Sequence, residues 1–388
     1  MTNFLIKKFV KNYQDVKNSD VRENYGAFAG IVGIIVNVFL SIAKFIAAAV
    51  SGFAVSVIAD ALNNLFDAVS SVVTFLGFKM SNKEEDSEHP FGHGRIEYIA
   101  GLIVSFVIIL VGFELLKESF SKIINPQTNS YSVISVVIMI VAILIKLWLG
   151  FFNKKLGKKI NSQTLKATAL DSFCDVAATL AVLTGLVFGL WLNINIEGYT
   201  GLMVSVFIIY TGIVSAKDTL SPLLGEAPDK EYTESIKQTV LAYDGILGVH
   251  DLIVHDYGAG RKMISLHAEV SADGDILKIH DLVDNIELEL RAKFHCHATI
   301  HMDPIDINDE FTNNLRKNVG EIIADIDDRL SFHDFRVVKG ITHTNLIFDL
   351  EVPFSCKIPL EQLMSIIRQR VADINENYYC VIEVDRIM

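Results

Sequence analysis

The stretch Ala59–Ser71 reads A-D-A-L-N-N-L-F-D-A-V-S-S and lies inside a long apolar run. A run of this length can cross the hydrocarbon core of a bilayer as one helix. Asp60, Asn63 and Asp67 are spaced i, i+3, i+7 and fall on one face of that helix. A carboxylate at bilayer depth is costly and almost always faces a protein interior or a water-filled path. The stretch therefore predicts a transport or ligand site inside a membrane domain.

The composition of the 388-residue chain is typical of a membrane protein with a soluble tail. Hydrophobic residues make up 51% of the sequence and the mean hydropathy is +0.38, which is too apolar for an ordinary soluble enzyme. The apolar residues are concentrated in the first 220 positions, whereas acidic residues dominate after Gly225. The net charge of -12 and the acidic tail argue against nucleic acid as a partner.

The cysteines and the N-terminal segment set the expected compartment. The four cysteines show neither C-x-x-C spacing nor close pairing, which predicts a tail in a reducing compartment. Residues 1–25 are polar and charged and show no signal peptide, so we expect the first membrane helix to direct insertion.

Six windows of about twenty mostly apolar residues recur before residue 220, each about long enough to span a core of roughly 30 Å. They are Ala27–Val50, Ala54–Phe78, Ile96–Leu116, Tyr131–Phe152, Leu165–Leu190 and Tyr199–Lys217. The loops after the second and fourth windows are rich in Lys and Arg, whereas those after the first and fifth carry none. The positive-inside rule then predicts a multi-pass protein of the cell membrane with both termini in the cytoplasm.

The composition after Gly225 changes to that of a soluble α/β domain, and its pattern occurs twice. Helices are expected at 231–241 and 276–294, with strands at 248–257, 262–271 and 298–302. The same order, α-β-β-α-β, returns with helices at 309–329 and 360–375 and strands at 334–339, 344–352 and 379–385. Short motifs also match, since V-H-D-L-I-V-H at 249–255 aligns with F-H-D-F-R-V-V at 332–338. We interpret this as a tandem duplication of one small α+β domain.

The fifth window contains a second acidic pair, Asp171 and Asp175, in A-L-D-S-F-C-D-V-A. These residues sit at i, i+4 on one helical face, as Asn63 and Asp67 do. Two helices that each offer a pair of oxygen ligands can close around one ion.

An alternative is that these acids pair with Lys44 and Lys146, which also lie within apolar windows. We rank this alternative lower because two lysines cannot neutralise four intramembrane acids, and a buried carboxylate without a partner would stay protonated.

These motifs together resemble the cation diffusion facilitator family over about residues 25–305. The resemblance rests on D-A-L-N-N-L-F-D in the second window, the loop H-P-F-G-H-G-R-I-E (His89–Glu97) and D-x-x-x-D in the fifth window. It implies a proton-coupled exporter of divalent transition metals that works as a homodimer in membrane lipid, with six spans per protomer. It also implies a cytoplasmic metal-binding domain of ferredoxin-like build.

The resemblance assigns metal ligands position by position, and it implies no organic cofactor and no catalytic residues. The transport site is Asn63, Asp67, Asp171 and Asp175; a loop site is Asp86, His89 and His93; the cytoplasmic site is His250, His267, His280, His301 and Asp303. The expected fold is thus an all-α six-helix transmembrane domain (26–220) after a cytoplasmic segment (1–25). Two α+β ferredoxin-like copies then follow at 226–307 and 308–388.

The ligand types favour Mn(II) as the transported metal. Zinc-transporting relatives generally place a His in the intramembrane quartet, whereas this quartet offers one amide oxygen and three carboxylates. Such hard oxygen ligands suit Mn(II), and the set resembles the manganese-exporting bacterial branch of the family. Zn(II), Fe(II) and Co(II) stay open as cargo.

Charge suggests how transport is driven. Three carboxylates around an empty site would take up protons, so metal and protons would compete for the same oxygens. Alternation of the site between the two sides of the membrane would then couple metal export to proton entry. A metal sensor or scaffold without transport is a second possibility, and an intramembrane enzyme is less favoured because neither H-E-x-x-H nor a nucleophile elbow occurs.

Two further expectations concern the loop and the second copy. We expect the loop to be structural first and a metal site second, with Arg95 and Glu97 pairing at the membrane edge. In the second copy His333 and Asp385 are retained, whereas the equivalents of His267 and His301 are Asp349 and Glu383. We therefore expect that copy to enlarge the dimer contact or tune regulation rather than to form a second equal metal site.

Overall fold

The computed structural model describes residues 2–16, 18–50, 55–125, 133–192, 196–258 and 261–387. The predicted window starts at Ala54 and Tyr131, most of the turn at 258–260 and the side chain of Asp60 lie outside the described part. The chain divides into two compact units. The helical unit holds 1–228 with 254–263 and 295–297, and the α+β unit holds 229–253, 264–294 and 298–388.

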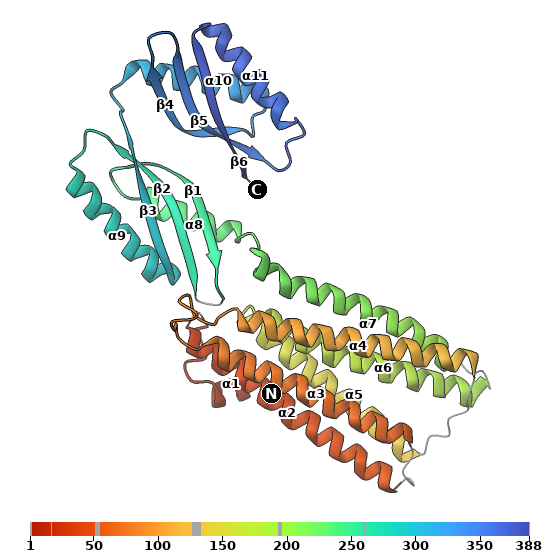
Figure 1. Cartoon of the computed structure of the whole chain (residues 1–388). Coiled ribbons are helices and arrows are strands. Elements are labelled where there is room, and N and C mark those ends of the chain that lie inside the picture. Colours follow the sequence, from red (N-terminus) through yellow and green to blue (C-terminus); the bar gives the residue numbers. More distant parts are fainter. Residues whose placement is uncertain are drawn as a thin grey trace. The chain divides into compact units, whose positions relative to one another are not determined.

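Among the residues that the structure describes, the helical unit has six long helices after a short helix, α1 (Thr2–Phe9) (Figure 1). They are α2 (Ser19–Val50), α3 (Val55–Ser81), α4 (Ile96–Ile124), α5 (Val133–Lys159), α6 (Gln163–Leu192) and α7 (Glu197–Leu220). A 3₁₀ turn, η1 (Ser221–Leu224), ends the last of them. Within the described residues, α2, α4, α5 and α7 are long and apolar enough to cross a membrane. Helices α3 and α6 carry the predicted intramembrane acids.

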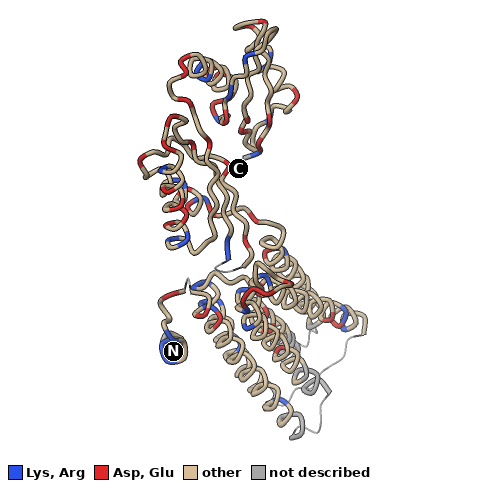
Figure 2. The backbone as a smooth tube through the Cα atoms, turned by 60° about the vertical axis from the view of Figure 1, so that its left-hand side comes forward, with Lys and Arg blue, Asp and Glu red and all other residues tan. Residues whose placement is uncertain are grey.

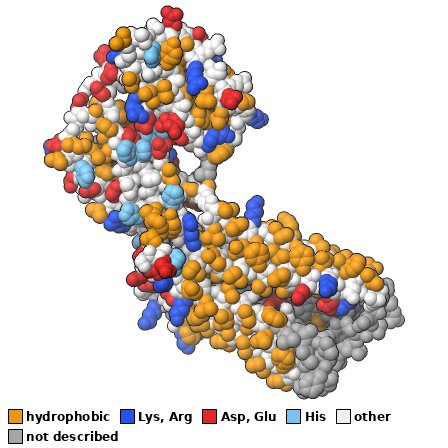
Figure 3. Space-filling view, viewed as in Figure 1, with side chains coloured by type: hydrophobic (Ala, Val, Ile, Leu, Met, Phe, Trp, Pro, Cys, Tyr) orange, Lys and Arg blue, Asp and Glu red, His pale blue; other side chains and the backbone are white. Residues whose placement is uncertain are grey.

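The outer surface of the helical unit is apolar. Ile35, Phe39, Leu110 and Phe113 are each more than half exposed. Figure 3 shows hydrophobic side chains over much of the described face of this unit. A contiguous apolar surface of this kind is unfavourable in water and suits the hydrocarbon core of a bilayer.

The interior of the helical unit combines large apolar side chains with close helix contacts. Tyr25, Phe78 and Phe152 are fully buried and join α2, α3 and α5 in one cluster. Helix α2 approaches α3 closely at Gly30, where a Cβ atom would come within 2.9 Å of the Phe75 backbone. Small residues permit this approach between membrane helices.

The α+β unit contains two three-stranded sheets, ordered β1-β2-β3 and β4-β5-β6. The first set is α8 (Lys230–Leu241), β1 (Ile246–Asp256), β2 (Lys262–Ser271), α9 (Ile276–Phe294) and β3 (Cys296–Ile305). The second set is α10 (Glu310–Ile326), β4 (Ser331–Lys339), β5 (Thr344–Pro353), α11 (Leu360–Ile374) and β6 (Tyr378–Ile387). Each set has the predicted order α-β-β-α-β, and Figure 2 shows acidic residues spread over both.

The second sheet shows why this pattern folds. Strand β5 pairs antiparallel with β4 and parallel with β6. Alternate residues of β5, from Leu346 to Val352, are fully buried. They pack with one face of α10 and one face of α11, including Val319 and Ile367. Apolar residues at every second position of β5 and at every third or fourth position of the two helices thus form a single core.

Each sheet has a left-handed residue at the same place. Asp251 in β1 and Asp334 in β4 have φ angles of 50° and 54°, and each directly follows a histidine. The β4–β5 register shifts between His333 and Arg336, which marks a bulge. Asp tolerates this conformation better than most residues, and a bulge re-aims the neighbouring side chains. The two His-Asp steps are therefore presented alike by the two sheets.

Candidate metal centres

Three carboxylates meet inside the helical unit. Asp67 projects from α3, and Asp171 and Asp175 project from α6, with ligand oxygens that lie within 4.8 Å of one another. Asp67 and Asp171 are buried at 4% and 8% exposure, and Asp175 is partly buried. A buried hydrogen bond of 3.0 Å between Thr74 and Thr168 joins the same two helices. The structure thus brings together three of the four residues predicted for the transport site.

The fourth residue, Asn63, lies one turn before Asp67 on α3 and is partly buried. This spacing places Asn63 and Asp67 on the same helical face. An amide oxygen and three carboxylates therefore come from two adjacent helices, with no Cys or His in the three-residue acidic group.

Lys146 of α5 lies between two of these carboxylates. Its Nζ atom is 2.7 Å from Oδ2 of Asp67 and 2.5 Å from Oδ2 of Asp175, and the residue is 3% exposed. We ranked this pairing low from the sequence, and for Lys146 that ranking is wrong. One ammonium group need not neutralise every acid, because placement between two carboxylates already offsets much of its desolvation cost. Lys44 of α2 is also buried.

The predicted loop residues also come together. His89 Nδ1 lies 3.3 Å from Oδ1 of Asp86, and His93 Nε2 lies 3.5 Å from Oδ2 of the same residue. The two imidazole rings are 4.5 Å apart. Lys83 donates a hydrogen bond to Asp86, and this bond with the backbone bond from His89 lowers the pKa of the Asp86 carboxyl below its ordinary value. Asp86 is thus held ionised beside two imidazoles.

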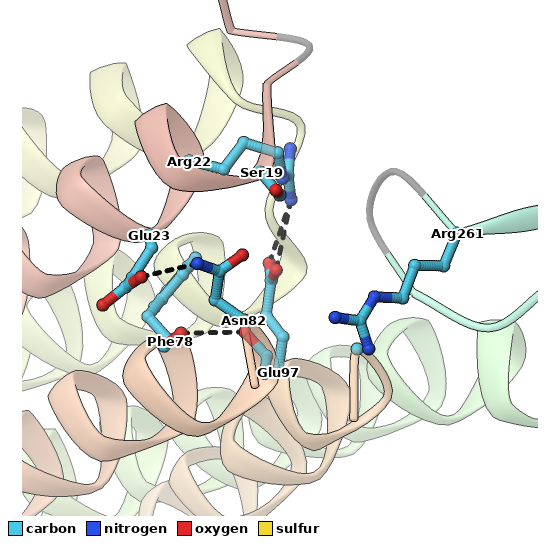
Figure 4. Close-up of a pocket in the computed structure, with 9 residues that line it drawn as sticks. Ser19, Arg22, Glu23, Phe78, Asn82, Glu97 and Arg261 are labelled. Atoms are coloured by element: carbon cyan, nitrogen blue, oxygen red, sulfur yellow. Dashed lines mark hydrogen bonds and ion pairs between the residues drawn. The ribbon is translucent and has the colours of Figure 1, made fainter. Parts of the chain in front are cut away.

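The expected pairing of Arg95 with Glu97 does not form. Residues two apart on a helix point in different directions, so these side chains cannot face each other. Glu97 instead pairs with Arg22 of α2 at 3.2 Å, as Figure 4 shows. Arg95 donates hydrogen bonds to the carbonyl of Asp256 and lies 4.5 Å over the ring of Tyr257. The loop therefore anchors the tip of the β1–β2 hairpin as well as the start of α4.

Figure 4 shows a small cavity between the ends of the helices α2, α3 and α4. It lies beside the Arg22–Glu97 pair, and Asn82 donates a hydrogen bond of 2.8 Å to Glu23 at its edge. Its volume of about 20 Å³ holds about one water molecule. The cavity is too small for a substrate with its ligand shell.

The first sheet of the α+β unit gathers four of the five residues predicted for the cytoplasmic site. His250, His267 and Asp303 come from β1, β2 and β3 and form one group. Asp303 Oδ2 lies 2.9 Å from His267 Nδ1 and 3.3 Å from His250 Nε2. His301 Nε2 is 3.3 Å from the other oxygen of Asp303. Neighbouring strands in one sheet bring these side chains together.

His280 is not part of this group. It projects from α9, is exposed, and lies 3.4 Å from Asp284 on the same helix. Among the described residues, none of the potential metal-binding groups includes His280.

The structure adds ligand groups that the sequence did not predict, because they join residues of the two sheets. His333 of β4 stacks on His250 with ring centroids 4.4 Å apart, and it forms groups with Asp334 and with Asp251 and Asp385. The repeated His-Asp step in the two strand motifs was the available signal. Figure 3 shows histidines beside acidic side chains on the α+β unit.

Comparison with known families identifies both regions. The family model described as the cation efflux transmembrane domain matches residues 30–224. The model described as the cation efflux protein, cytoplasmic domain, matches residues 228–305.

Individual relatives agree with these matches. An uncharacterised transporter of Methanocaldococcus jannaschii is 28% identical over 280 residues, which are 71% of this chain and 97% of the relative. The manganese efflux system protein MneS of Bacillus subtilis is 28% identical over 249 residues, covering 64% of this chain and 85% of the relative. The cation-efflux pump FieF of Cronobacter sakazakii is 26% identical over 285 residues, covering 73% and 94%. The chain belongs to the cation efflux family of membrane metal transporters, the cation diffusion facilitators.

Proposed function

We propose that this transporter exports a divalent transition metal, Mn(II) before others, from the cytoplasm in exchange for protons. The observation that carries the proposal is the meeting of Asp67, Asp171 and Asp175 between α3 and α6. Buried carboxylates at membrane depth are costly without a cation, and a divalent ion fits a site of hard oxygen atoms.

The preference for Mn(II) rests on ligand type. The group on α3 and α6 supplies carboxylate oxygens, and Asn63 adds an amide oxygen on the same helical face. Imidazole and thiolate ligands, which favour Zn(II), do not belong to this group. The printed name of the relative MneS, a manganese efflux protein, agrees with this choice. Zn(II), Fe(II) and Co(II) are the alternative cargoes.

Lys146 supplies a positive charge to the carboxylates when no metal is bound. Three carboxylates and one ammonium group sum to a formal charge of -2, so the cation-free site is partly neutralised. A divalent ion that binds Asp67 and Asp175 must displace the ammonium group from the same oxygens. Metal, ammonium and protons then compete for one set of carboxylates, and this competition couples metal release to proton binding.

Two accessory metal sites belong to the same proposal. Asp86, His89 and His93 form a loop site, with Lys83 as the competing cation. His250, His267, His301 and Asp303 form a cytoplasmic site of mixed nitrogen and oxygen ligands. His280 contributes to neither site through contacts within the chain.

The proposal extends to the topology and assembly of the transporter. We propose six membrane spans, α2 to α7, with both termini in the cytoplasm and two chains per transporter. The match of residues 228–305 to the family's cytoplasmic domain supports the dimer. The shared element order of the two sheets supports tandem ferredoxin-like copies of one domain.

The test is metal flux into proteoliposomes with a pH gradient. Asp67→Ala and Asp175→Ala are each expected to abolish Mn(II) transport, because each removes a ligand and leaves Lys146 partly unpaired. Asp218→Ala is the matched control, since Asp218 lies exposed on α7 outside the group. Retained transport in the two site variants would overturn the assignment. Metal binding without flux in the unmodified protein would favour the sensor function instead.

A further inference from the structure

The two halves of the α+β unit present equivalent His-Asp steps to each other. His250 and Asp251 come from β1, and His333 and Asp334 come from β4. The rings of His250 and His333 are stacked at an interplanar angle of 24°. Each histidine also faces the aspartate of the other half, since His333 Nε2 lies 3.3 Å from Asp251 and His250 Nε2 lies 3.9 Å from Asp334.

A ligand set with members from both halves lies beside the first cytoplasmic group. His333 Nε2 is 3.3 Å from Oδ1 of Asp251 and 3.5 Å from Oδ2 of Asp385. One atom from each of these three residues lies within 4.8 Å of the others. Asp385 is on β6 and Asp251 is on β1, so neither half holds this set alone.

Asp251 faces both groups with different oxygen atoms. Its Oδ1 points to His333, whereas its Oδ2 lies 3.5 Å from His250 and 3.9 Å from His267. A carboxylate in this position can bridge two cations, one held by each group.

The histidines between the two groups are buried without hydrogen bonds. His250 and His333 are 6% and 5% exposed. Within the described part of the chain, neither ring nitrogen of either residue has a partner in hydrogen-bond geometry, although a carboxylate oxygen lies 3.3 Å from each Nε2. Buried polar atoms of this kind cost free energy unless a partner satisfies them, and a neutral imidazole nitrogen is a common metal ligand.

The carboxylates of the composite set repel one another. Asp251 and Asp385 lie 3.3 Å and 3.5 Å from the same imidazole nitrogen of His333, so two like charges are held close together. A cation between Asp251 and Asp385 would remove this repulsion, as ions do in carboxylate sites generally.

We propose that His333, Asp385 and Asp251 form a second metal site, built across the two halves of the tail and joined through Asp251 to the site of His250, His267 and Asp303. One imidazole and two carboxylates suit a divalent transition metal. The prediction that the second copy forms no equal metal site concerns that copy alone, whereas Asp251 of the first copy supplies the third ligand here. The ion would hold the two halves together in addition to the Arg316–Glu269 ion pair, which joins them at 3.1 Å. This inference does not depend on transport.

The test counts Zn(II) bound to the full-length protein in detergent, by elemental analysis after gel filtration. His333→Gln and Asp385→Asn are each expected to lose one Zn(II) per chain. Glu383→Gln is the matched control, since Glu383 is an exposed carboxylate two residues before Asp385 on the same strand, and it should lose none. His267→Ala combined with His333→Gln should lose two. An unchanged Zn(II) count in both single variants overturns the proposal.

A second measurement needs no variant. Mn(II)-loaded full-length protein should show the electron paramagnetic resonance signal of a spin-coupled Mn(II) pair, because Asp251 faces both sites. Signals from isolated Mn(II) ions alone would contradict the shared carboxylate. Because both readouts concern binding, their failure would leave the flux experiment on Asp67 and Asp175 unaffected.

Discussion

Lys146 contacts two of the acids that the sequence predicts to lie within the membrane. Its ammonium group lies within 2.7 Å of both Asp67 and Asp175, so the site holds its own cation. Spacing along α3 and α6 predicted the acids, because residues one turn apart share a helical face. The same reasoning could not place Lys146, since the rotation of α5 against α3 and α6 depends on packing between helices.

Lys146→Met should separate metal binding from turnover. Removing the Lys146 ammonium group takes away the cation that contacts both Asp67 and Asp175, so the apparent Kd for Mn(II) should fall about tenfold or more while transport slows. Breaking a buried ion pair of this kind costs about 3 kcal/mol, so the metal-free protein should also unfold at a lower temperature. Binding titration, vesicle flux and thermal unfolding measure the three effects.

The control for this change is Lys158→Met, which alters an exposed lysine on the same helix. It should leave the Kd, the flux and the unfolding temperature near those of the unmodified protein. Equal Mn(II) affinity in Lys146→Met and Lys158→Met would show that the ammonium group does not compete with the metal.

A second single-residue change, Asn63→His, tests how the site selects its metal. An imidazole nitrogen in place of an amide oxygen should shift competition in vesicle flux toward Zn(II), because Zn(II) favours nitrogen ligands more than Mn(II) does. The measurement is the concentration of Zn(II) that halves Mn(II) transport, and it should fall. An unchanged metal profile would count against selection by hard ligands.

At the scale of elements, the α+β region was largely predictable. Alternation in β5 and the helical period of α10 placed both elements within a few residues of the observed ends. Strands β3 and β4 extend beyond their predicted ranges, to Ile305 and back to Ser331. Pro304 in β3 and the left-handed Asp334 in β4 interrupt the signals that mark a strand.

The loop before α4 and the β1–β2 hairpin form a contact that local patterns could not predict. Gly258 has a φ angle of +113°, and a Cβ atom there would come within 2.5 Å of the Gly94 backbone. Phe91 packs on Tyr257 with ring centroids 4.7 Å apart. Arg261 also donates a hydrogen bond of 2.8 Å to the Lys83 carbonyl.

Gly258→Val should therefore disrupt this contact. Both the positive φ angle and the missing space oppose a branched side chain, and strained positions of this kind cost about 1 to 3 kcal/mol each. We expect reduced Mn(II) flux with an unchanged Kd at the proposed transport site, because no described residue of the hairpin belongs to the acidic group. Gly225→Val is the control, since Gly225 is also left-handed but has open space around it. Equal flux in the two variants would argue against a role for the contact.

At the scale of the whole molecule, the sequence predicted a helical membrane domain and a soluble α+β region, and family comparison confirmed the class. It did not predict that the second sheet would complete a ligand group with the first. The residues of that group are 134 positions apart, from Asp251 to Asp385 (385 − 251), and only tertiary packing joins them. Local sequence patterns cannot predict which distant residues come close enough to bind one metal ion.

We propose that Asp67, Asp171 and Asp175 hold the transported metal. Anomalous scattering at the Mn absorption edge, measured on crystals soaked in Mn(II), tests it most directly. We predict a peak between α3 and α6 at bonding distance from Asp67 and Asp175, with the Lys146 ammonium group displaced from both. Peaks confined to the loop and the α+β unit, with Lys146 still between the two carboxylates, would contradict the account.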